Sequence, residues 1–255
     1  MTEDSRQRIR SSYSGSGDGY DDLRLRDPGG ALLSRHDLRL FDQLFQPPEE
    51  ATRVVEIGAG TGRFTLAALA RGVRVLATDV NESLLDALRQ KLDAAGLADR
   101  CQVESEDIFK LSFEDGSVDY AYSIHVLPRF LNLDDQRAAI AEVARTLRTG
   151  GRFLFNFRNA DSLIYGRFDR MHAARTRDIE GFLRGAGLRI VERRGKWLLT
   201  GRLVRILPAP LRPLAAAVDR LLWRFLTDRA WDVFIVAEKI GDDLAAGADE
   251  SRAGL

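Results

Sequence analysis

Cysteine is almost absent from this 255-residue sequence, which contains only Cys101. A single cysteine cannot form an internal disulfide framework, so the sequence is typical of a reducing compartment and we expect a cytoplasmic location. Net charge is absent as well, because 38 Lys and Arg residues balance 38 Asp and Glu residues. This balance leaves no overall electrostatic attraction to nucleic acid, and we expect no nucleic-acid partner.

Long apolar runs and histidine are scarce too. No stretch approaches the ~20 apolar residues of a membrane-spanning helix, and the N-terminus has no apolar signal-peptide core. The three histidines, His36, His125 and His172, lie far apart in the sequence and lack the spacing of metal ligands. We therefore expect neither a membrane span nor a metal site.

The sequence does contain a regular alternation of strand-like and helical segments between residues 31 and 240. The strand-like runs are 53–57, 73–79, 101–105, 117–124, 151–157, 188–193 and 231–239, and the helical patterns are 32–45, 62–71, 82–94, 134–147 and 177–185. This alternation predicts an α/β fold with a doubly wound, mostly parallel sheet and right-handed crossovers. The last run breaks the alternation, so we expect a terminal strand that inserts antiparallel beside its predecessor.

Three regions differ from this pattern. Residues 1–30 and 241–255 are polar, which predicts a flexible N-terminal flap and a disordered tail. Residues 195–230 form an insertion with seven basic and two acidic residues, a local net charge of +5. We expect a basic amphipathic helix there, with an apolar stripe made of Leu211, Leu214, Val218, Leu221, Leu222 and Phe225.

Residues 54–65, VVEIGAGTGRFT, read as a strand, a tight loop and the start of a helix. In a doubly wound sheet the carboxyl ends of the strands bind ligands, and this loop is the first such end. Carboxylates occur at the same edge, because Glu56 precedes the loop while Asp79 and Asp107 follow the second and third strands. The ligand should therefore carry hydroxyls, hydrogen-bond donors and positive charge.

Two nucleotide ligands compete for this loop. An NAD(P)-type fingerprint, Gly-x-Gly-x-x-Gly, would need its third glycine at position 63, where the sequence has Arg63. A pyrophosphate would also be repelled by Glu56 behind the loop. S-adenosylmethionine carries an ammonium and a sulfonium and no phosphate, so we favour it and keep an NAD(P)-dependent oxidoreductase as the alternative.

Five successive motifs, VVEIGAGTGRFT, ATDVNESLL, ESEDIF, VDYAYSIHVL and LRTGGRFLF, resemble those of the class I S-adenosylmethionine-dependent methyltransferases of the small-molecule type. The resemblance covers residues 50–195 and returns at 231–240. It implies a Rossmann-like methyltransferase fold with a seven-stranded sheet of order 3-2-1-4-5-7-6, the last strand antiparallel. It also implies that the methionine part of the cofactor is lined by Glu56, Gly58, Ala59, Gly60, Thr61 and Gly62.

The same resemblance assigns the adenosine part of the cofactor. It implies that Asp79 holds the ribose hydroxyls and that Val80 lies against the adenine face. Asp107, together with the backbone of Ile108, would bind the adenine amino group. The N-terminal flap resembles a segment that closes over the cofactor in many members of the family, and Arg24 within it would meet the methionine carboxylate.

The segment YSIHVLPRF ends the fourth strand, where Ser123 would lie near the sulfonium. The Asn/Asp-Pro-Pro-Tyr/Phe signature of amino-group methylation and the Pro-Cys nucleophile of cytosine methylation are both absent. We therefore expect methyl transfer to an oxygen, carbon or nitrogen of a small or lipid-like molecule. His125 is a candidate general base, since an imidazole can take a proton as the methyl group moves. Alternatively, it only orients backbone near the pocket.

The basic insertion at 195–230 leaves further alternatives open. Its helix packs over the sheet edge or against a partner subunit, or it lies in a membrane interface beside a lipid-like acceptor. The remaining rival functions are a non-catalytic module that binds the cofactor as a signal and a module that uses the insertion to contact RNA.

Overall fold

The computed structural model describes residues 28–130, 132–162, 173–196 and 207–241. Residues 1–27 of the predicted flap 1–30, with Arg24 among them, lie outside the described residues, as does the tail from residue 242 onward. Residues 197–206 of the predicted insertion lie outside them too. Their predicted roles stay predictions. Residues 28–30 belong to the first described helix rather than to a flap.

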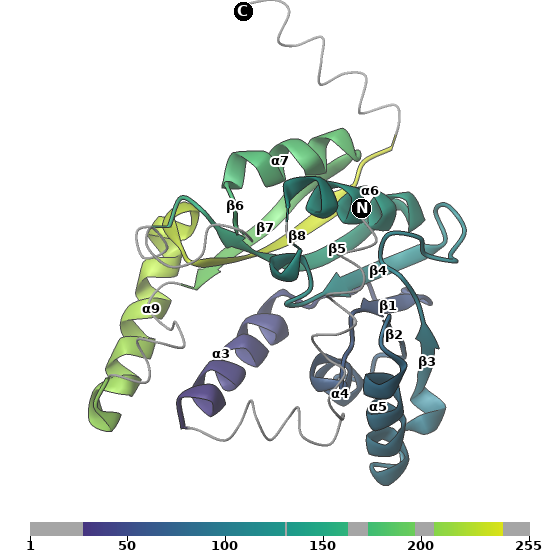
Figure 1. Ribbon diagram of the computed structural model, residues 1–255, viewed down its shortest axis with the longest axis horizontal. Coiled ribbons are helices and arrows are strands. Elements are labelled where there is room, and N and C mark those ends of the chain that lie inside the picture. Colours follow the sequence, from purple (N-terminus) through teal and green to yellow (C-terminus); the bar gives the residue numbers. More distant parts are fainter. Residues whose placement is uncertain (1–27, 131, 163–172, 197–206, 242–255) are drawn as a thin grey trace, which may run out of the picture.

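One mixed sheet runs through the molecule (Figure 1). Its strands are β1 (Val54–Ile57), β2 (Val75–Asp79), β3 (Cys101–Ser105), β4 (Val118–Ser123), β5 (Leu147–Asn159), β6 (Ala173–Ala174), β7 (Leu188–Lys196) and β8 (Asp232–Lys239). The order is β3-β2-β1-β4-β5-β8-β7, with the two-residue β6 beside β5. Strand β8 is antiparallel to both neighbours, β5 and β7. The predicted strand order and its antiparallel last strand are confirmed, and only β6 was not predicted.

The helices form two layers, with α3, α4 and α5 covering one face of the sheet and α6 and α7 the other (Figure 1). The α-helices are α3 (Pro28–Leu44), α4 (Arg63–Ala70), α5 (Glu82–Ala94), α6 (Leu133–Thr146), α7 (Thr176–Gly185) and α9 (Arg212–Leu226). Short 3₁₀ turns are η1 (Ala98–Arg100), η2 (Leu127–Arg129), η3 (Ala209–Leu211) and η4 (Thr227–Arg229). Helix α9 contacts β7 and lies at the end of the molecule farthest from β3 (Figure 1).

Aromatic side chains hold α3 against the sheet. Phe41 of α3 and Phe45, which directly follows this helix, are fully buried and stack with ring centroids 4.7 Å apart. Phe45 meets Tyr120 at 5.3 Å, Phe41 meets Tyr122 at 5.3 Å, and both tyrosines belong to β4. Buried aromatic rings contribute strongly to core energetics, so these contacts fix the C-terminal end of α3 on the sheet. The turns before them, which include Asp37, lie near the carboxyl ends of the strands.

Strand β7 extends further than its sequence pattern predicts. It continues through Lys196, which pairs in register with Asp232 of β8 and is buried. The predicted insertion at 195–230 therefore begins two residues too early, and Lys196 contributes no charge to a basic surface because its ammonium is paired inside the protein. The predicted amphipathic helix lies within this range as α9.

Candidate functional site

The glycine loop between β1 and α4 cannot carry side chains at two of its positions. Gly58 and Gly62 have φ values of 80° and 87°, in the left-handed region that side chains disfavour. A Cβ at Gly58 would lie 2.2 Å from Cγ2 of Val126, and one at Gly62 would lie 2.2 Å from Cδ1 of Leu88. The loop is glycine-rich because other segments pack directly against its backbone.

The peptide N–H groups of this loop are bonded within the protein. Gly58 and Ala59 both donate to the carbonyl of Thr78, at 2.7 and 2.8 Å. Gly60 donates to the Asp79 carboxylate at 2.9 Å, and Gly62 donates to the carbonyl of Ala59 at 3.0 Å. Loops that bind pyrophosphate aim their N–H groups at the phosphate oxygens. These four groups are instead occupied by protein acceptors.

Glu56 lies directly beneath the loop and is buried, with 2% of its surface exposed. Its Oε2 accepts hydrogen bonds from Thr65 Oγ1 at 2.5 Å and from the Tyr122 hydroxyl at 3.0 Å. Burial raises the pKa of the Glu56 carboxyl to about 7. A cation placed above the loop would reverse this effect, because a nearby positive charge favours the carboxylate.

Asp79 ends β2 beside the loop, and the segment after β3 begins next to it. The Asp79 carboxylate accepts the N–H groups of Gly60 and Asn81, each at 2.9 Å, and burial raises its pKa. The Asp79 carbonyl accepts the N–H of Glu106 at 3.1 Å, which joins the two strand ends. Asp107 follows at once and accepts the N–H of Phe109 at 3.0 Å. The structure therefore brings the predicted ribose and adenine carboxylates to one edge.

The remaining predicted cofactor residues lie along the same edge. Val80 is partly exposed after Asp79, and Ile108 is buried after Asp107. The carbonyl of Thr61 accepts a hydrogen bond from Lys91 Nζ at 2.9 Å. Ser123 is fully buried and donates to the carbonyl of Ile57 at 2.8 Å, which links β4 to β1. The Ser123 hydroxyl therefore already has a protein partner, and its contact with a sulfonium stays a prediction.

His125 follows β4 with an unusual backbone. Its φ is 66°, which makes it the one non-glycine residue of the described ranges with positive φ. Histidine is among the side chains that tolerate this region, and such strained positions cluster at functional sites. The His125 peptide N–H donates to Asn156 Oδ1 at 2.6 Å, which holds the turn in place.

The His125 imidazole belongs to a closed polar ring of five side chains: Asp37 of α3, His125, Asn156 of β5, Asp232 of β8 and Lys196 of β7. Because β8 is antiparallel, it begins at the edge where β5 and β7 end. The ring contacts are His125 Nε2 to Asp37 (2.9 Å), Asp37 to Lys196 (2.8 Å), Lys196 to Asp232 (3.3 Å), Asp232 to Asn156 (2.8 Å) and Asn156 to His125 Nδ1 (3.2 Å).

Electrostatics fix the state of each member of this ring. Burial lowers the pKa of His125 to about 4, so the imidazole is neutral at pH 7. Asp37 can only accept, so Nε2 of His125 carries the proton and Nδ1 accepts from the Asn156 amide. Burial opposes the ionisation of Asp37, yet the charge of Lys196 holds its pKa well below the usual value. Both ring nitrogens of His125 thus have protein partners.

Most of this polar ring was not predicted from the sequence. Asn156 stands alone among apolar residues in the run FLFNF, and a polar side chain in a fully buried strand is a signal that could have been used. Lys196 and Asp232 look like ordinary strand-end charges, and Asp37 like an exposed helix residue. Among the residues that the structure describes, no cluster of His, Cys, Asp and Glu has the arrangement of a metal site.

Comparisons with known proteins agree with this geometry. Residues 54–151 match a family described as a methyltransferase domain. A sterol 4-C-methyltransferase of Caenorhabditis elegans is 30% identical over 105 residues, which cover 41% of this chain and 30% of the relative. The chain covers less than half the length of the first curated relatives it matches, 30% and 43%.

Solved structures share the fold across most of the chain. A geranyl diphosphate methyltransferase in complex with S-adenosylmethionine superposes with a TM-score of 0.60 at 16% identity, over 86% of this chain and 95% of that one. The [4+2]-cyclase SpnF superposes with a TM-score of 0.58 at 18% identity, over 80% of this chain and 82% of that one. Identities this low show the fold alone.

The fold and the matched domain define a Rossmann-like enzyme of the methyltransferase type. Residues 54–151 are thus a methyltransferase domain, and the resemblance to the class I S-adenosylmethionine-dependent methyltransferases drawn from the motifs is confirmed.

Proposed function

We propose that the protein uses S-adenosylmethionine to methylate a small or lipid-like molecule. The observation that carries this proposal is the glycine loop, whose N–H groups are bonded to protein acceptors and which lies over a buried carboxylate, Glu56. Such a loop disfavours a pyrophosphate and suits a cationic nucleoside. The alternative of an NAD(P)-dependent oxidoreductase has no support from the related proteins.

The reaction is a backside displacement at the sulfonium methyl group. The acceptor atom forms a bond to the methyl carbon while the carbon–sulfur bond breaks, and the sulfur keeps the electron pair as S-adenosylhomocysteine. The proton of a hydroxyl or amine acceptor leaves to water or to a nearby base. Holding the acceptor in line with an already activated methyl group supplies most of the rate.

Calorimetric titration of the purified protein tests the cofactor assignment. We expect heat with S-adenosylhomocysteine and none with NADH. Asp79→Ala should weaken S-adenosylhomocysteine binding by about 100-fold, since hydrogen bonds to a charged group contribute ~1.5–3 kcal/mol. Asp86→Ala is the matched control, because Asp86 is an exposed carboxylate on α5. Equal affinity of the Asp79 variant and the wild type would contradict the placement of the ribose.

We propose an isoprenoid-like acceptor within the class of small or lipid-like molecules. Two related proteins support this class, since one is named as a sterol methyltransferase and the other as a demethylmenaquinone methyltransferase. Labelled S-adenosylmethionine should transfer its methyl group to members of a panel of sterols, prenyl diphosphates, quinone precursors and lipid-linked sugars. Label transferred only to water-soluble phenols or amines in a wider panel would overturn the acceptor class.

The exposed face of α9 suggests how a lipid-like acceptor is reached. Leu214, Val218 and Leu221 lie on one face of α9, and Leu214 and Leu221 are 61% and 64% exposed. The sequence of 197–230 carries six basic and two acidic residues, a charge that complements an anionic surface. We propose that α9 rests on an anionic membrane with this apolar face inserted. No helix of the described ranges is long and apolar enough to cross a membrane.

Sedimentation with lipid vesicles tests the membrane contact. We expect the protein to bind vesicles of phosphatidylglycerol and phosphatidylcholine more strongly than vesicles of phosphatidylcholine alone. Leu214→Glu with Leu221→Glu should abolish binding, whereas Val191→Glu, which changes an exposed residue of β7, should not. A stable dimer that the double variant dissociates, without any vesicle binding, would assign this face to a second copy of the chain instead.

The proposed cytoplasmic location and the absence of a nucleic-acid partner rest on composition. Cys101 is a buried free thiol, and the total charge is balanced. Tight RNA binding that falls steeply with salt concentration would contradict the second of these proposals.

A further inference from the structure

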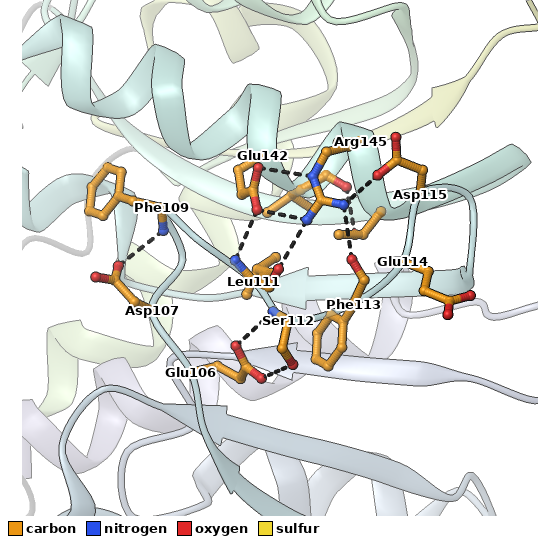
Figure 2. A network of polar contacts seen from close by, with 12 residues as sticks. Glu106, Asp107, Phe109, Leu111, Ser112, Phe113, Glu114, Asp115, Glu142 and Arg145 are labelled. Atoms are coloured by element: carbon orange, nitrogen blue, oxygen red, sulfur yellow. Dashed lines mark hydrogen bonds and ion pairs between the residues drawn. The ribbon is translucent and has the colours of Figure 1, made fainter.

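The segment between β3 and β4, residues 106–116, contains the predicted adenine-binding residues Asp107 and Ile108 but little regular structure. Such a segment holds a ligand-binding geometry only if something outside it fixes its backbone. Figure 2 shows that a single side chain, Arg145 near the end of α6, reaches into this segment and contacts it at several points. No part of the proposed function has yet used Arg145.

The Arg145 guanidinium has five N–H donors, and five contacts occupy its three nitrogens. The contacts are Nε to Glu142 Oε2 (3.1 Å), Nη2 to Glu142 Oε1 (2.7 Å), Nη2 to the Leu111 carbonyl (3.0 Å), Nη1 to the Phe113 carbonyl (2.9 Å) and Nη1 to Asp115 Oδ1 (2.5 Å). The backbone carbonyl of Arg145 also accepts the N–H of Gly116 at 3.0 Å. Arg145 therefore holds the far half of the segment by both its side chain and its backbone.

Glu142, one helical turn before Arg145, also contacts the segment, and we call the contacts of Arg145 and Glu142 with residues 111–116 the clasp. Its Oε1 accepts the N–H of Leu111 at 2.9 Å, so both the N–H and the carbonyl of Leu111 are held from α6. The bidentate pairing with Glu142 also orients the planar guanidinium toward the segment. A lysine has a single ammonium and could not reproduce this fork.

Hydrogen bonds within the segment connect Leu111 and its neighbours to Asp107. Ser112 donates its N–H to Glu106 at 3.0 Å, and its hydroxyl also contacts the Glu106 carboxylate. Asp107 accepts the N–H of Lys110 at its carbonyl, at 2.8 Å, and the N–H of Phe109 at its carboxylate. In Figure 2 the Asp107 carboxylate points away from Arg145 and contacts Phe109.

We propose that Arg145, with Glu142, is a positioning residue that determines adenine specificity by fixing the backbone that carries Asp107. The proposal rests on the proposed function, since it concerns the same cofactor. Without the clasp, the Asp107 carboxylate no longer meets the 6-amino group in one fixed geometry. The loss should therefore concern the recognition of the base more than the binding of the ribose or the methionine part, which Asp79 and the glycine loop contact.

A comparison of two ligands isolates this role. One is S-adenosylhomocysteine, and the other is S-inosylhomocysteine, in which a carbonyl replaces the 6-amino group. We expect the wild-type protein to prefer the adenine ligand, and Arg145→Met to lower that preference by about tenfold, as expected for the loss of one hydrogen bond to a charged group. Arg145→Lys should lower it nearly as much. A ratio of affinities measured on one protein sample is insensitive to a fraction that fails to fold.

Two further variants complete the test. Arg137→Met is the matched control, since Arg137 is an exposed arginine of the same helix that pairs with Asp134 and not with the segment 106–116. It should leave the preference unchanged. Glu142→Gln keeps an acceptor for Leu111 but removes the charge, so it should lower the preference for the adenine ligand by a smaller factor. This variant provides the test if Arg145→Met does not fold. Equal loss of affinity for both ligands, or no loss, would overturn the proposal. A wild-type protein that binds neither ligand would instead overturn the proposed function.

Discussion

Glu56 is the residue whose burial has the clearest thermodynamic consequence. It is a carboxyl group enclosed beneath the glycine loop, and its Oε2 accepts hydrogen bonds from two hydroxyl groups. Burial raises its pKa from 4.5 to about 7, so the ligand-free folded protein retains a proton that the unfolded chain releases. The proposed role of Glu56 in binding a cationic cofactor would require the ionised form.

The stability of the ligand-free protein should therefore depend on pH through Glu56. A folded pKa above the unfolded value gives stability that is fully present below pH 4.5 and is lost as the pH rises through about 7. Between pH 5 and pH 8 we expect the free energy of unfolding to fall by about 2.5 kcal/mol more in the wild type than in Glu56→Gln. Urea denaturation at both pH values measures the difference. An identical change in the free energy of unfolding with pH for the two proteins would contradict this account of Glu56.

His125 is the second residue whose role can be decided. Both its nitrogens have protein partners, so we expect it to position the turn after β4 rather than to remove a proton. His125→Asn, which also tolerates positive φ, should then keep turnover within about tenfold of wild type. A loss of ~10²–10⁴-fold, with loss of the basic or acidic limb of the pH–rate profile, would assign the general base to His125 after all. The measurement needs an acceptor from the labelled panel.

Among the elements, α3 depends on the polar ring for its contact with the far strands. Its apolar half packs on β4, while Asp37 joins it to β7 through Lys196. Lys196 is buried, and its two carboxylate partners raise its pKa against the effect of burial. The ion pairs therefore connect a helix of one face to the carboxyl edge of β7 and β8.

Lys196→Met should destabilise the protein by about 3–5 kcal/mol, because it leaves Asp37 and Asp232 buried without a compensating charge. Adding Asp37→Asn should recover part of this loss, since one of the uncompensated charges is then gone. Chemical denaturation of the two single variants and the double variant gives the coupling energy, expected at about 1–3 kcal/mol. Arg137→Met, which breaks an exposed ion pair, should cost less than about 1 kcal/mol. Simple additivity in the cycle would mean that the pair is not coupled.

At the scale of the whole molecule, ligand binding should appear as global stability. S-adenosylhomocysteine at 100 times its dissociation constant should raise the free energy of unfolding by about 2.7 kcal/mol. NADH at the same concentration should leave it unchanged, because the loop offers its N–H groups to protein acceptors. Denaturation curves with each ligand make the comparison, and stabilisation by NADH alone would reverse the choice of cofactor.

Local pattern accounts for much of what was predicted. The strands and helices follow from the alternation of apolar runs with helical periods, and β3 and α5 have the predicted limits. The glycine loop and the carboxylates Asp79 and Asp107 were found because they follow the ends of successive strands in the sequence. Arg145 and the polar ring were not found, because their partners are distant in sequence: Lys196 lies 159 residues from Asp37.

The sequence alone determined the class of fold, since it depends on periodicity. Its motifs, through their resemblance to a known family, determined the order of the strands, and its residues at strand ends indicated the edge proposed for the cofactor. Only the tertiary structure decided the state of His125, the burial of Lys196 and the attachment of the adenine segment to α6. Those properties depend on which charges and hydrogen-bond donors meet in a low-dielectric interior. The chain brings such groups together only when separate elements pack, so no local stretch of sequence specifies them.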